Sequence, residues 1–404
     1  MVVDCILDTN NSSAGPDGIP FRAYRSFATL IAPVFLSIFE DMSAGGLPPQ
    51  GFNYAYLYLL PKRLTGLIEH TRPISVTNTD NRVLAKCLVF VILPVIQERL
   101  HKAQKGSIAG RQGADHIREI TEQFYEAAET SSAKSNFFAF FIDTRKAFDS
   151  VRHNFIYAAL RHMGLPEWVV NIVRAMLHLI AVTPVFGSST GIWIAITRGV
   201  KQGCPTSPVI FAICLNVLII RLAGVTGIVV WAYVDDMALG ARKVRVFAVC
   251  MIIIDEFTDV SGLGVNRDKT RIVAARADGE GRDAESWVLS KQCPWRSKGV
   301  QCAKIYVYLG LLLGRGVTVG DVWRCVVLKA LDRAGWQSTA PPSGHYRLIG
   351  VLIYLTSLST LYFLILPLFT VSPISGSSRT TRLKKLFAQP SFHLVIQVLN
   401  MLIT

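Results

Sequence analysis

The 404-residue sequence lacks the features of a secreted, disulfide-built or low-complexity protein. Its first fifteen residues carry an early acid and no basic region, so we do not expect a signal peptide. Its eight cysteines show no CxxC pair and no Cys/His spacing typical of a metal site. Several lie in apolar runs, where reduced, buried thiols are expected. With 51% hydrophobic residues and no internal repeat, the sequence predicts an intracellular globular protein (cytoplasm or nucleus) of one large or several smaller domains.

Acidic residues are too few to balance the basic ones. The chain has 28 Asp and Glu against 42 Lys and Arg, which gives a net charge of +14 and a pI near 9.5. Such a charge favours polyanionic partners, meaning nucleic acid or an acidic membrane surface. Because the excess is dispersed along the chain, we expect a charged groove on a globular body rather than a disordered basic arm.

Charge is absent altogether between Leu348 and Ser378. Within that stretch, Leu348–Val371 is nearly all apolar and long enough to span a bilayer. Serines, threonines and Pro367 interrupt it, which favours a buried helix or helix pair. A membrane span, and with it a membrane-anchored protein, stays open as the alternative.

Apolar periodicity predicts an α+β fold, with helices around a few strands that are not consecutive in the chain. The expected helices cover residues 21–42, 80–101, 146–163, 209–222 and 244–260. The expected strands cover residues 55–60, 137–142 and 306–313, with a hairpin over 183–197.

One stretch indicates the chemistry. Two apolar runs, Ile228–Tyr233 and Met237–Leu239, flank Asp235 and Asp236, which predicts a hairpin with carboxylates at its tip. Asp143 ends another apolar strand; if the strands are neighbours, three carboxylates meet at one rim of a sheet. Such oxygen donors suit Mg²⁺, and two such ions can stabilise a phosphoryl transfer. Adjacent strand residues point to opposite faces, so the paired acids need not be equivalent. A solvated structural turn is the alternative.

Other residues fit a triphosphate site. Lys62 and Arg72 are cations able to clamp phosphates, and Lys146 begins a helix whose N-terminus favours anions. The loop Gly199–Gly203 offers a cation, an amide side chain and two glycines that permit close backbone approach. Each is weak alone, since an isolated surface cation is usually just solvated.

Taken in order, the motifs resemble the reverse transcriptase domain of a non-LTR (LINE-like) retrotransposon. They are GPDGIP at 15–20, LPK at 60–62, RPIS at 72–75, QKGSIAGRQGADHI at 104–117, FIDTRKAFDSV at 141–151, GVKQGCPTSP at 199–208, YVDD at 233–236, SGLGVNRDKT at 261–270 and YLG at 308–310. The resemblance covers about residues 15–315 strongly.

The resemblance implies a right-hand polymerase with fingers, a palm built on a small antiparallel sheet, and a mainly helical thumb. The fingers would occupy residues 1–136 with a return at about 152–198, the palm 137–310 with the catalytic site, and the thumb 311–404. The reverse transcriptase domain would cover about residues 45–315 overall. The activity implied is RNA-directed DNA polymerisation, with an RNA template, a DNA primer and dNTPs as partners and two Mg²⁺ ions, or Mn²⁺, as cofactors.

The resemblance also implies roles for single residues. Asp143, Asp235 and Asp236 would be the metal-binding catalytic carboxylates, and Lys269 would protonate pyrophosphate, although a plain surface lysine is the alternative. Phe148 would exclude a ribose 2′-hydroxyl, a role compatible with a core position, and Asp149 would be structural. The nucleotide-binding set would be Arg72, Lys62, Lys146, Phe148, Gln202 and Gly203. The primer grip would be Tyr308, Leu309 and Gly310.

Three rival interpretations remain at this point. Such a protein normally carries an upstream endonuclease domain, so we expect a fragment of a longer polyprotein or a decayed genomic copy. A catalytically inactive remnant that only binds nucleic acid is one rival. A group II intron maturase-like reverse transcriptase and a membrane-anchored protein are the others.

Overall fold

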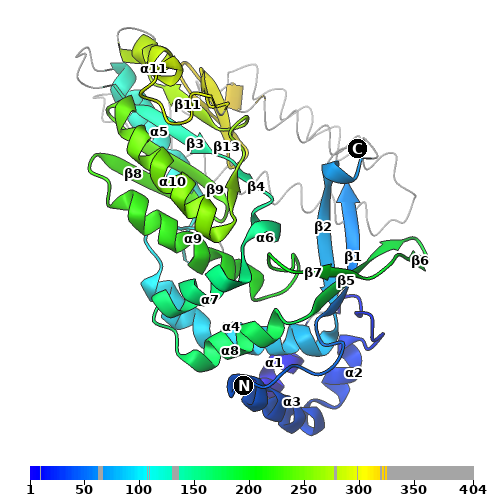
Figure 1. Ribbon diagram of the computed structural model, residues 1–404. Coiled ribbons are helices and arrows are strands. Elements are labelled where there is room, and N and C mark those ends of the chain that lie inside the picture. Colours follow the sequence, from blue (N-terminus) through cyan, green and yellow to red (C-terminus); the bar gives the residue numbers. More distant parts are fainter. Residues whose placement is uncertain are drawn as a thin grey trace, which may run out of the picture. The chain divides into compact units, whose positions relative to one another are not determined.

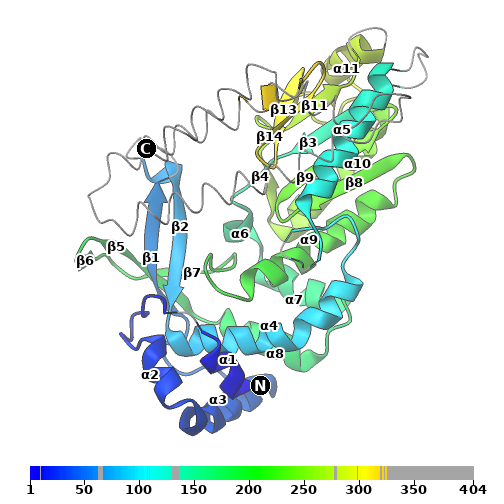
Figure 2. The ribbon, with the colours of Figure 1, turned by 180° about the vertical axis from the view of Figure 1, so that it is seen from behind.

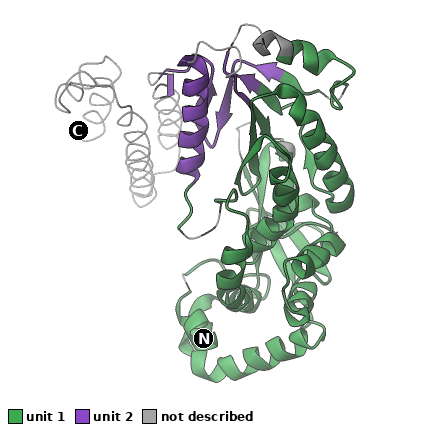
Figure 3. Cartoon of the chain, turned by 90° about the vertical axis from the view of Figure 1, so that its left-hand side faces the viewer, with its two compact units in different colours: residues 1–112, 139–272, 284–301 green, residues 113–138, 273–283, 302–404 purple. Residues whose placement is uncertain are grey.

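The computed structural model describes residues 1–9, 11–61, 67–106, 108, 110–129, 136–276, 280–297, 299–318, 321–322 and 324. The chain consists of two compact units (Figure 3). Unit 1 comprises residues 1–112, 139–272 and 284–301, and unit 2 comprises 113–138, 273–283 and 302–404. The mixture of helices with small sheets confirms the predicted α+β class.

The N-terminal part of unit 1 is helical. It contains α1 (Val2–Leu7), α2 (Phe21–Ser26), α3 (Ala28–Ser43) and α4 (Thr79–Arg99). The single helix predicted over residues 21–42 is wrong, because Phe27 leaves the helical region at φ −121° and ψ 26°. The apolar period runs through this break because α2 and α3 bury their apolar faces together, with the rings of Tyr24 and Phe35 stacked at 5.6 Å.

A mixed sheet extends from these helices, with strand order β2-β1-β5-β6 and β7 paired to β5. The strands and the 3₁₀ turn before β2 are β1 (Tyr54–Pro61), η1 (Ile68–His70), β2 (Thr71–Thr77), β5 (Ile180–Phe186), β6 (Ser189–Thr190) and β7 (Ile194–Ile196). Figure 2 shows β1 and β2 side by side as a long antiparallel ribbon, in which Leu60 pairs with Arg72. β1 runs parallel to β5, and the buried Asn53 amide donates to the carbonyls of Ala175 and His178 just before β5.

A second sheet has the strand order β12-β11-β3-β9-β8. Its strands are β3 (Phe138–Ile142), β8 (Ile228–Tyr233), β9 (Asp236–Ala241), β11 (Arg271–Ala274) and β12 (Gln301–Ala303). All five residues of β3 are buried, as its uninterrupted apolar run predicts. The helices α9 (Ser207–Ala223) and α10 (Phe247–Ser261) pack along this sheet (Figure 1), and α9 is buried nearly all round, as predicted.

Shorter elements connect these parts of the chain. They are β4 (Thr144–Arg145), α6 (Ala147–Ser150), α7 (His153–His162), α8 (Glu167–Met176), η3 (Val244–Val246), β10 (Gly264–Val265) and α11 (Glu280–Leu289). The single helix predicted over 146–163 is wrong, since α6 and α7 are separate. The backbone between them bonds elsewhere: Val151 accepts from Gly199 at 2.6 Å, and Arg152 donates to Ser261 at 2.8 Å.

Unit 2 contains α5 (Gly113–Glu129) and a small hairpin formed by β13 (Ile305–Tyr308) and β14 (Leu311–Gly314). The single strand predicted over 306–313 is wrong, because Leu309 and Gly310 form a two-residue turn with φ of 47° and 86°. Positive φ at both positions is the requirement of a type I′ hairpin turn, whose twist matches that of the strands it joins.

Within the described residues, no helix combines the length and the apolar character needed to cross a bilayer. The uncharged stretch Leu348–Val371, and with it the question of a buried helix or a span, lies outside the described residues.

Candidate active site

The acidic hairpin has the predicted strands and a tight tip. Tyr233 of β8 pairs with Asp236 of β9, which leaves Val234 and Asp235 as a two-residue loop. Val234 sits at φ +54°, a region that β-branched residues almost never enter. Asp235 is therefore presented by the loop itself, whereas Asp236 begins a strand, so the two acids are not equivalent.

Asp143 lies next to this hairpin because β3 and β9 are neighbours in the sheet. The Asp143 amide donates to Thr270 Oγ1 at 3.3 Å, and its carbonyl accepts from the Asn266 amide at 2.7 Å. One residue further on, Thr144 Oγ1 donates to the Asp235 carbonyl at 3.3 Å. The structure thus meets the condition, set by the sequence analysis, that these strands be neighbours.

The three carboxylates share one electrostatic environment. Desolvation of Asp236, together with the negative charges of Asp235 and Asp143, raises the pKa of this carboxyl to about 6. Repulsion from Asp235 and Asp143 acts on Asp236 only if the three acids lie close together.

A cleft of about 870 Å³ in unit 1 opens beside these acids. Eight of the residues predicted to act at the site line it: Arg72, Asp143, Lys146, Phe148, Gln202, Gly203, Asp235 and Lys269. They come from β2, the end of β3, α6, the loop before α9, the hairpin tip and the segment after β10. The fold thus brings together residues that lie as much as 197 positions apart in the chain (72 to 269).

The cleft carries charges of both signs. Its lining includes four cations, Arg72, Arg145, Lys146 and Lys269, and the carboxylates of Asp143, Asp149 and Asp235. Lys146 lies between β4 and the first residue of α6 and has φ +47°. The chain therefore changes direction at Lys146. Cations and acids that line the same cleft suit a ligand that is itself a metal-bound polyphosphate.

The loop before α9 is held on two sides. The Ser75 amide of β2 donates to the Gln202 carbonyl at 2.7 Å, and the Gln202 amide side chain donates to Asp149 Oδ1 at 3.2 Å. Gly203 has φ +110°, and a Cβ added there would lie 2.6 Å from the Ser75 carbonyl oxygen. Asp149 therefore has a positioning contact, which agrees with the structural role expected for it.

Phe148 belongs to both the cleft and the core. Its ring stacks on that of Phe211 with the centroids 4.8 Å apart and the planes at 20°, while the residue is only half-buried and lines the cleft. One face of the Phe148 ring is therefore fixed against α9.

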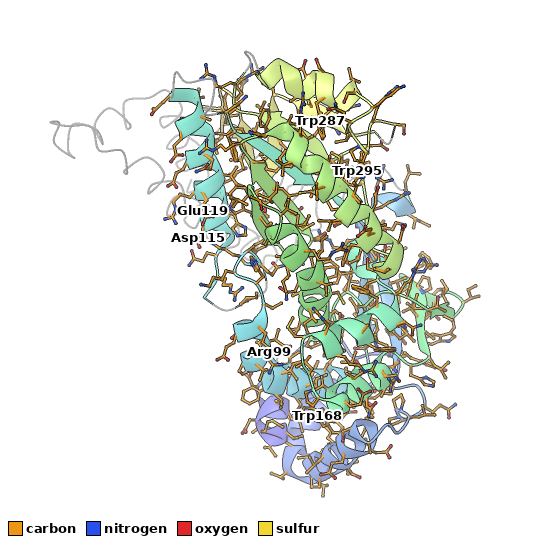
Figure 4. The ribbon with its side chains drawn as sticks, turned by 60° about the vertical axis from the view of Figure 1, so that its left-hand side comes forward. Arg99, Asp115, Glu119, Trp168, Trp287 and Trp295 are labelled. Atoms are coloured by element: carbon orange, nitrogen blue, oxygen red, sulfur yellow. The ribbon has the colours of Figure 1, made fainter. Side chains whose placement is uncertain are left out.

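The segment Asn266–Lys269 is anchored from outside the cleft. Arg267 donates to Asp255 of α10 and lies over the ring of Trp295, 5.1 Å from its centroid. The fully buried Trp295, labelled in Figure 4, donates its indole N–H to Asp255 Oδ2 at 3.0 Å. Asn266 and Lys269, on either side of this anchor, both line the cleft.

Four other described residues of the predicted set do not line the cleft: Asp236, which begins β9, and three residues of unit 2. Tyr308 ends β13, and Leu309 and Gly310 form its turn, all within unit 2. Lys62 lies outside the described residues.

The carboxylates of Asp143, Asp235 and Asp236 suit a divalent cation in their charge and in their oxygen donors, although they do not form a complete coordination shell. Among the residues that the structure describes, no group of three or more His, Cys, Asp or Glu side chains is arranged to hold a metal ion. The oxygen donors of Asp143 and Asp235 nevertheless line one cleft, and both raise the pKa of Asp236. A bound cation would relieve this repulsion between carboxylates.

Sequence reasoning missed three residues of the site. Thr144 bonds the hairpin tip, Asn266 lines the cleft, and Gln104 bonds the tip from the opposite side. Gln104 opens one of the quoted motifs, but no pattern in the sequence indicates that its side chain contacts a turn 130 residues later.

Comparison with known proteins finds a matching family model and several relatives. The family model described as "Reverse transcriptase (RNA-dependent DNA polymerase)" matches residues 60–311, which is more than half of the chain. The chain is 27% identical over 248 residues to "Transposon TX1 uncharacterized 149 kDa protein" of Xenopus laevis, covering 58% of this chain and 19% of that protein.

Two further relatives are polyproteins. The chain is 29% identical over 221 residues to "Retrovirus-related Pol polyprotein from type-1 retrotransposable element R2" of Popillia japonica (52% of this chain, 30% of that protein). It is 27% identical over 279 residues to "Retrovirus-related Pol polyprotein from type-2 retrotransposable element R2DM" of Drosophila melanogaster (64% and 24%). The chain therefore spans less than a third of the length of these relatives.

Proposed function

The chain belongs to the reverse transcriptase (RNA-dependent DNA polymerase) family, in its non-LTR retrotransposon branch, and we propose that it copies RNA into DNA. In the proposed reaction the 3′-hydroxyl of a DNA primer attacks the α-phosphate of a dNTP. The new phosphodiester bond forms as the bond to pyrophosphate breaks. The observation that carries this proposal is the cleft in which Asp143 and Asp235 lie among four cations.

Members of this family generally use divalent metal ions. Asp143, Asp235 and Asp236 would hold two Mg²⁺ ions, or Mn²⁺ in their place, through carboxylate oxygens. When bound, such ions stabilise the charge on the attacking and leaving oxygens. Asp235 lines the cleft and Asp236 does not, which supports Asp235 as the ligand that faces the cleft.

Nucleotide binding falls to the cations and the held loop. Arg72 and Lys146 would bind the triphosphate, with Lys62 as a further candidate, while Gln202 and Gly203 would flank the base-paired nucleotide. The ring of Phe148, fixed against Phe211, would exclude a ribose 2′-hydroxyl.

Lys269 would donate a proton to the departing pyrophosphate, for which its place on the cleft wall is suitable. Tyr308, Leu309 and Gly310 would form the primer grip, a role compatible with the tight turn of their hairpin. In the right-hand arrangement that we propose, residues 1–136 with 152–198 are the fingers, 137–310 contain the palm, and 311–404 form the thumb. Cys5, Cys87, Cys214 and Cys250 are buried thiols that form no disulfide, which supports an intracellular location.

Primer extension on an RNA template with dNTPs and Mg²⁺ tests the proposal. Wild type is expected to extend the primer, and Asp235→Asn to lose nearly all incorporation because it removes a metal-binding charge from the cleft. Asp259→Asn on α10 makes the same chemical change at an exposed site and is expected to match wild type. Equal incorporation by wild type and Asp235→Asn would refute the proposal. RNA binding that weakens with salt, without any incorporation, would instead support a nucleic-acid-binding remnant.

A further inference from the structure

Gln104 contacts the hairpin tip with both ends of its side-chain amide. Its Oε1 accepts from the Val234 amide at 3.0 Å, and its Nε2 donates to the Val234 carbonyl at 3.3 Å. The same Oε1 also accepts from the Gly106 amide at 2.9 Å. Gln104 is fully buried, so these bonds replace the water that an exposed turn would use.

The segment around Gln104 is itself joined to β8. The Lys105 amide donates to the Ala232 carbonyl at 2.9 Å, and the Ala232 amide donates to the Ala103 carbonyl at 3.0 Å. Arg111 fixes this segment from behind by donating to the Gln104 carbonyl at 2.8 Å and to that of His101 at 2.9 Å. The side chain of Gln104 is therefore presented from a rigid support.

Val234 needs such a support. At φ +54° its branched Cβ is strained, and strain of this kind persists only where the surroundings over-determine the backbone. Gly106 packs directly on the tip, and a Cβ added at Gly106 would overlap the Val234 amide nitrogen and side chain. On the other side of the loop, Thr144 Oγ1 bonds the Asp235 carbonyl.

We propose that Gln104 is a positioning residue that holds Val234 in its left-handed conformation and so fixes the directions of Asp235 and Asp236. The effect of Gln104 on catalysis rests on the proposed function, whereas its effect on the conformation of the hairpin tip does not. Only glutamine has the length and the paired donor and acceptor that this geometry uses: glutamate lacks the donor, and asparagine is one methylene shorter.

Kinetics of primer extension test the catalytic consequence. Gln104→Ala and Gln104→Glu are expected to lower kcat by about 10- to 100-fold, the range that corresponds to releasing one strained residue. The KM for dNTP is expected to change by less than about threefold, because the nucleotide contacts remain. Gln292→Ala, at an exposed glutamine of the same unit, is the matched control and is expected to behave as wild type.

A double-mutant cycle separates positioning from simple loss of packing. Val234→Gly removes the side chain that makes φ +54° costly, so the turn no longer needs the clamp. Gln104→Ala combined with Val234→Gly is therefore expected to recover at least about tenfold in kcat over Gln104→Ala alone. Losses that simply add in the double variant would overturn the proposal.

Hydrogen–deuterium exchange tests the clamp without metal, substrate or turnover. In Gln104→Ala, exchange of the peptide covering residues 229–239 is expected to rise about tenfold or more, while α10 exchanges as in wild type. Gly106→Ala is expected to act in the same way. The control Gly224→Ala is expected to leave exchange at residues 229–239 unchanged, since a Cβ at Gly224 meets nothing closer than 3.5 Å. Unchanged exchange at 229–239 would refute the clamp, whereas a wild type inactive in primer extension would refute only the proposed function.

Discussion

Replacing Gly203 with alanine introduces a methyl group at a point where two segments of backbone touch. Gly203 has φ +110°, which alanine adopts only under strain, and the new Cβ would lie 2.6 Å from the Ser75 carbonyl oxygen. Neither atom belongs to a flexible side chain, so β2 and the loop before α9 must separate. The bond between the Ser75 amide and the Gln202 carbonyl, now 2.7 Å long, would break.

The magnitude follows from these two effects. Backbone strain of this kind costs about 1–3 kcal/mol, and the lost hydrogen bond adds about 1 kcal/mol. A loss of about 2–4 kcal/mol should lower the melting temperature by about 5–15 °C in a unit of this size. Separation of β2 from the loop also moves Arg72 away from Gln202, so the KM for dNTP should rise. Thermal melting by circular dichroism and steady-state primer extension measure the two consequences.

Gly187→Ala isolates the clash from the conformational penalty. Gly187 also has positive φ, +60°, but a Cβ there meets no atom within 4 Å. Gly187→Ala should lower the free energy of unfolding by about 1 kcal/mol and leave the KM for dNTP unchanged. If Gly203→Ala is as stable as Gly187→Ala and has the wild-type KM, the reasoning from close approach is wrong.

Two further predictions concern buried charge. Burial raises the pKa of Asp80 from 3.8 to about 6, so its stabilising contribution is complete below pH 3.8 and is lost as the pH rises through 6. Between pH 4 and 7 the melting temperature of wild type should therefore fall relative to that of Asp80→Asn, and the corresponding loss of stability is about 1–3 kcal/mol. The control Asp259→Asn should show the same pH dependence as wild type. Parallel melting curves against pH for Asp80→Asn and wild type would contradict this prediction. Asp255→Ala should lower the free energy of unfolding by about 2–4 kcal/mol, because Arg267 and the Trp295 indole lose their shared acceptor. A melting temperature within about 2 °C of wild type would show that these bonds to Asp255 are dispensable.

Elements with a strong pattern could be predicted from the sequence. The β8 strand has the predicted bounds, Ile228–Tyr233, because its apolar residues are enclosed by turn residues at both ends. The adjacency of Asp143 and the hairpin could be stated only as a condition, since the order of strands in a sheet depends on long-range pairing. The structure meets that condition by placing β3 next to β9.

Breaks within helices could not be predicted, for a physical reason. The apolar period continues across Phe27 and across Val151 because the helices on either side share one core. Each break depends on the local backbone or on bonds to distant segments, such as that from Gly199 to Val151. The contact between Gln104 and Val234 was missed for the same reason: a glutamine in a loop has no periodicity that reveals its partner.

The parallel pairing of β1 with β5 constrains the order of events during synthesis. Tyr54 pairs with Ala181, 127 residues later, and Asn53 bonds the carbonyls of Ala175 and His178. A ribosome must therefore release about residue 186 from its exit tunnel before β1 can acquire its second neighbour, and until then the β1 edge of the β1–β2 ribbon is unpaired. A nascent chain arrested before this point would expose that edge to other chains, whereas one arrested after β5 would not.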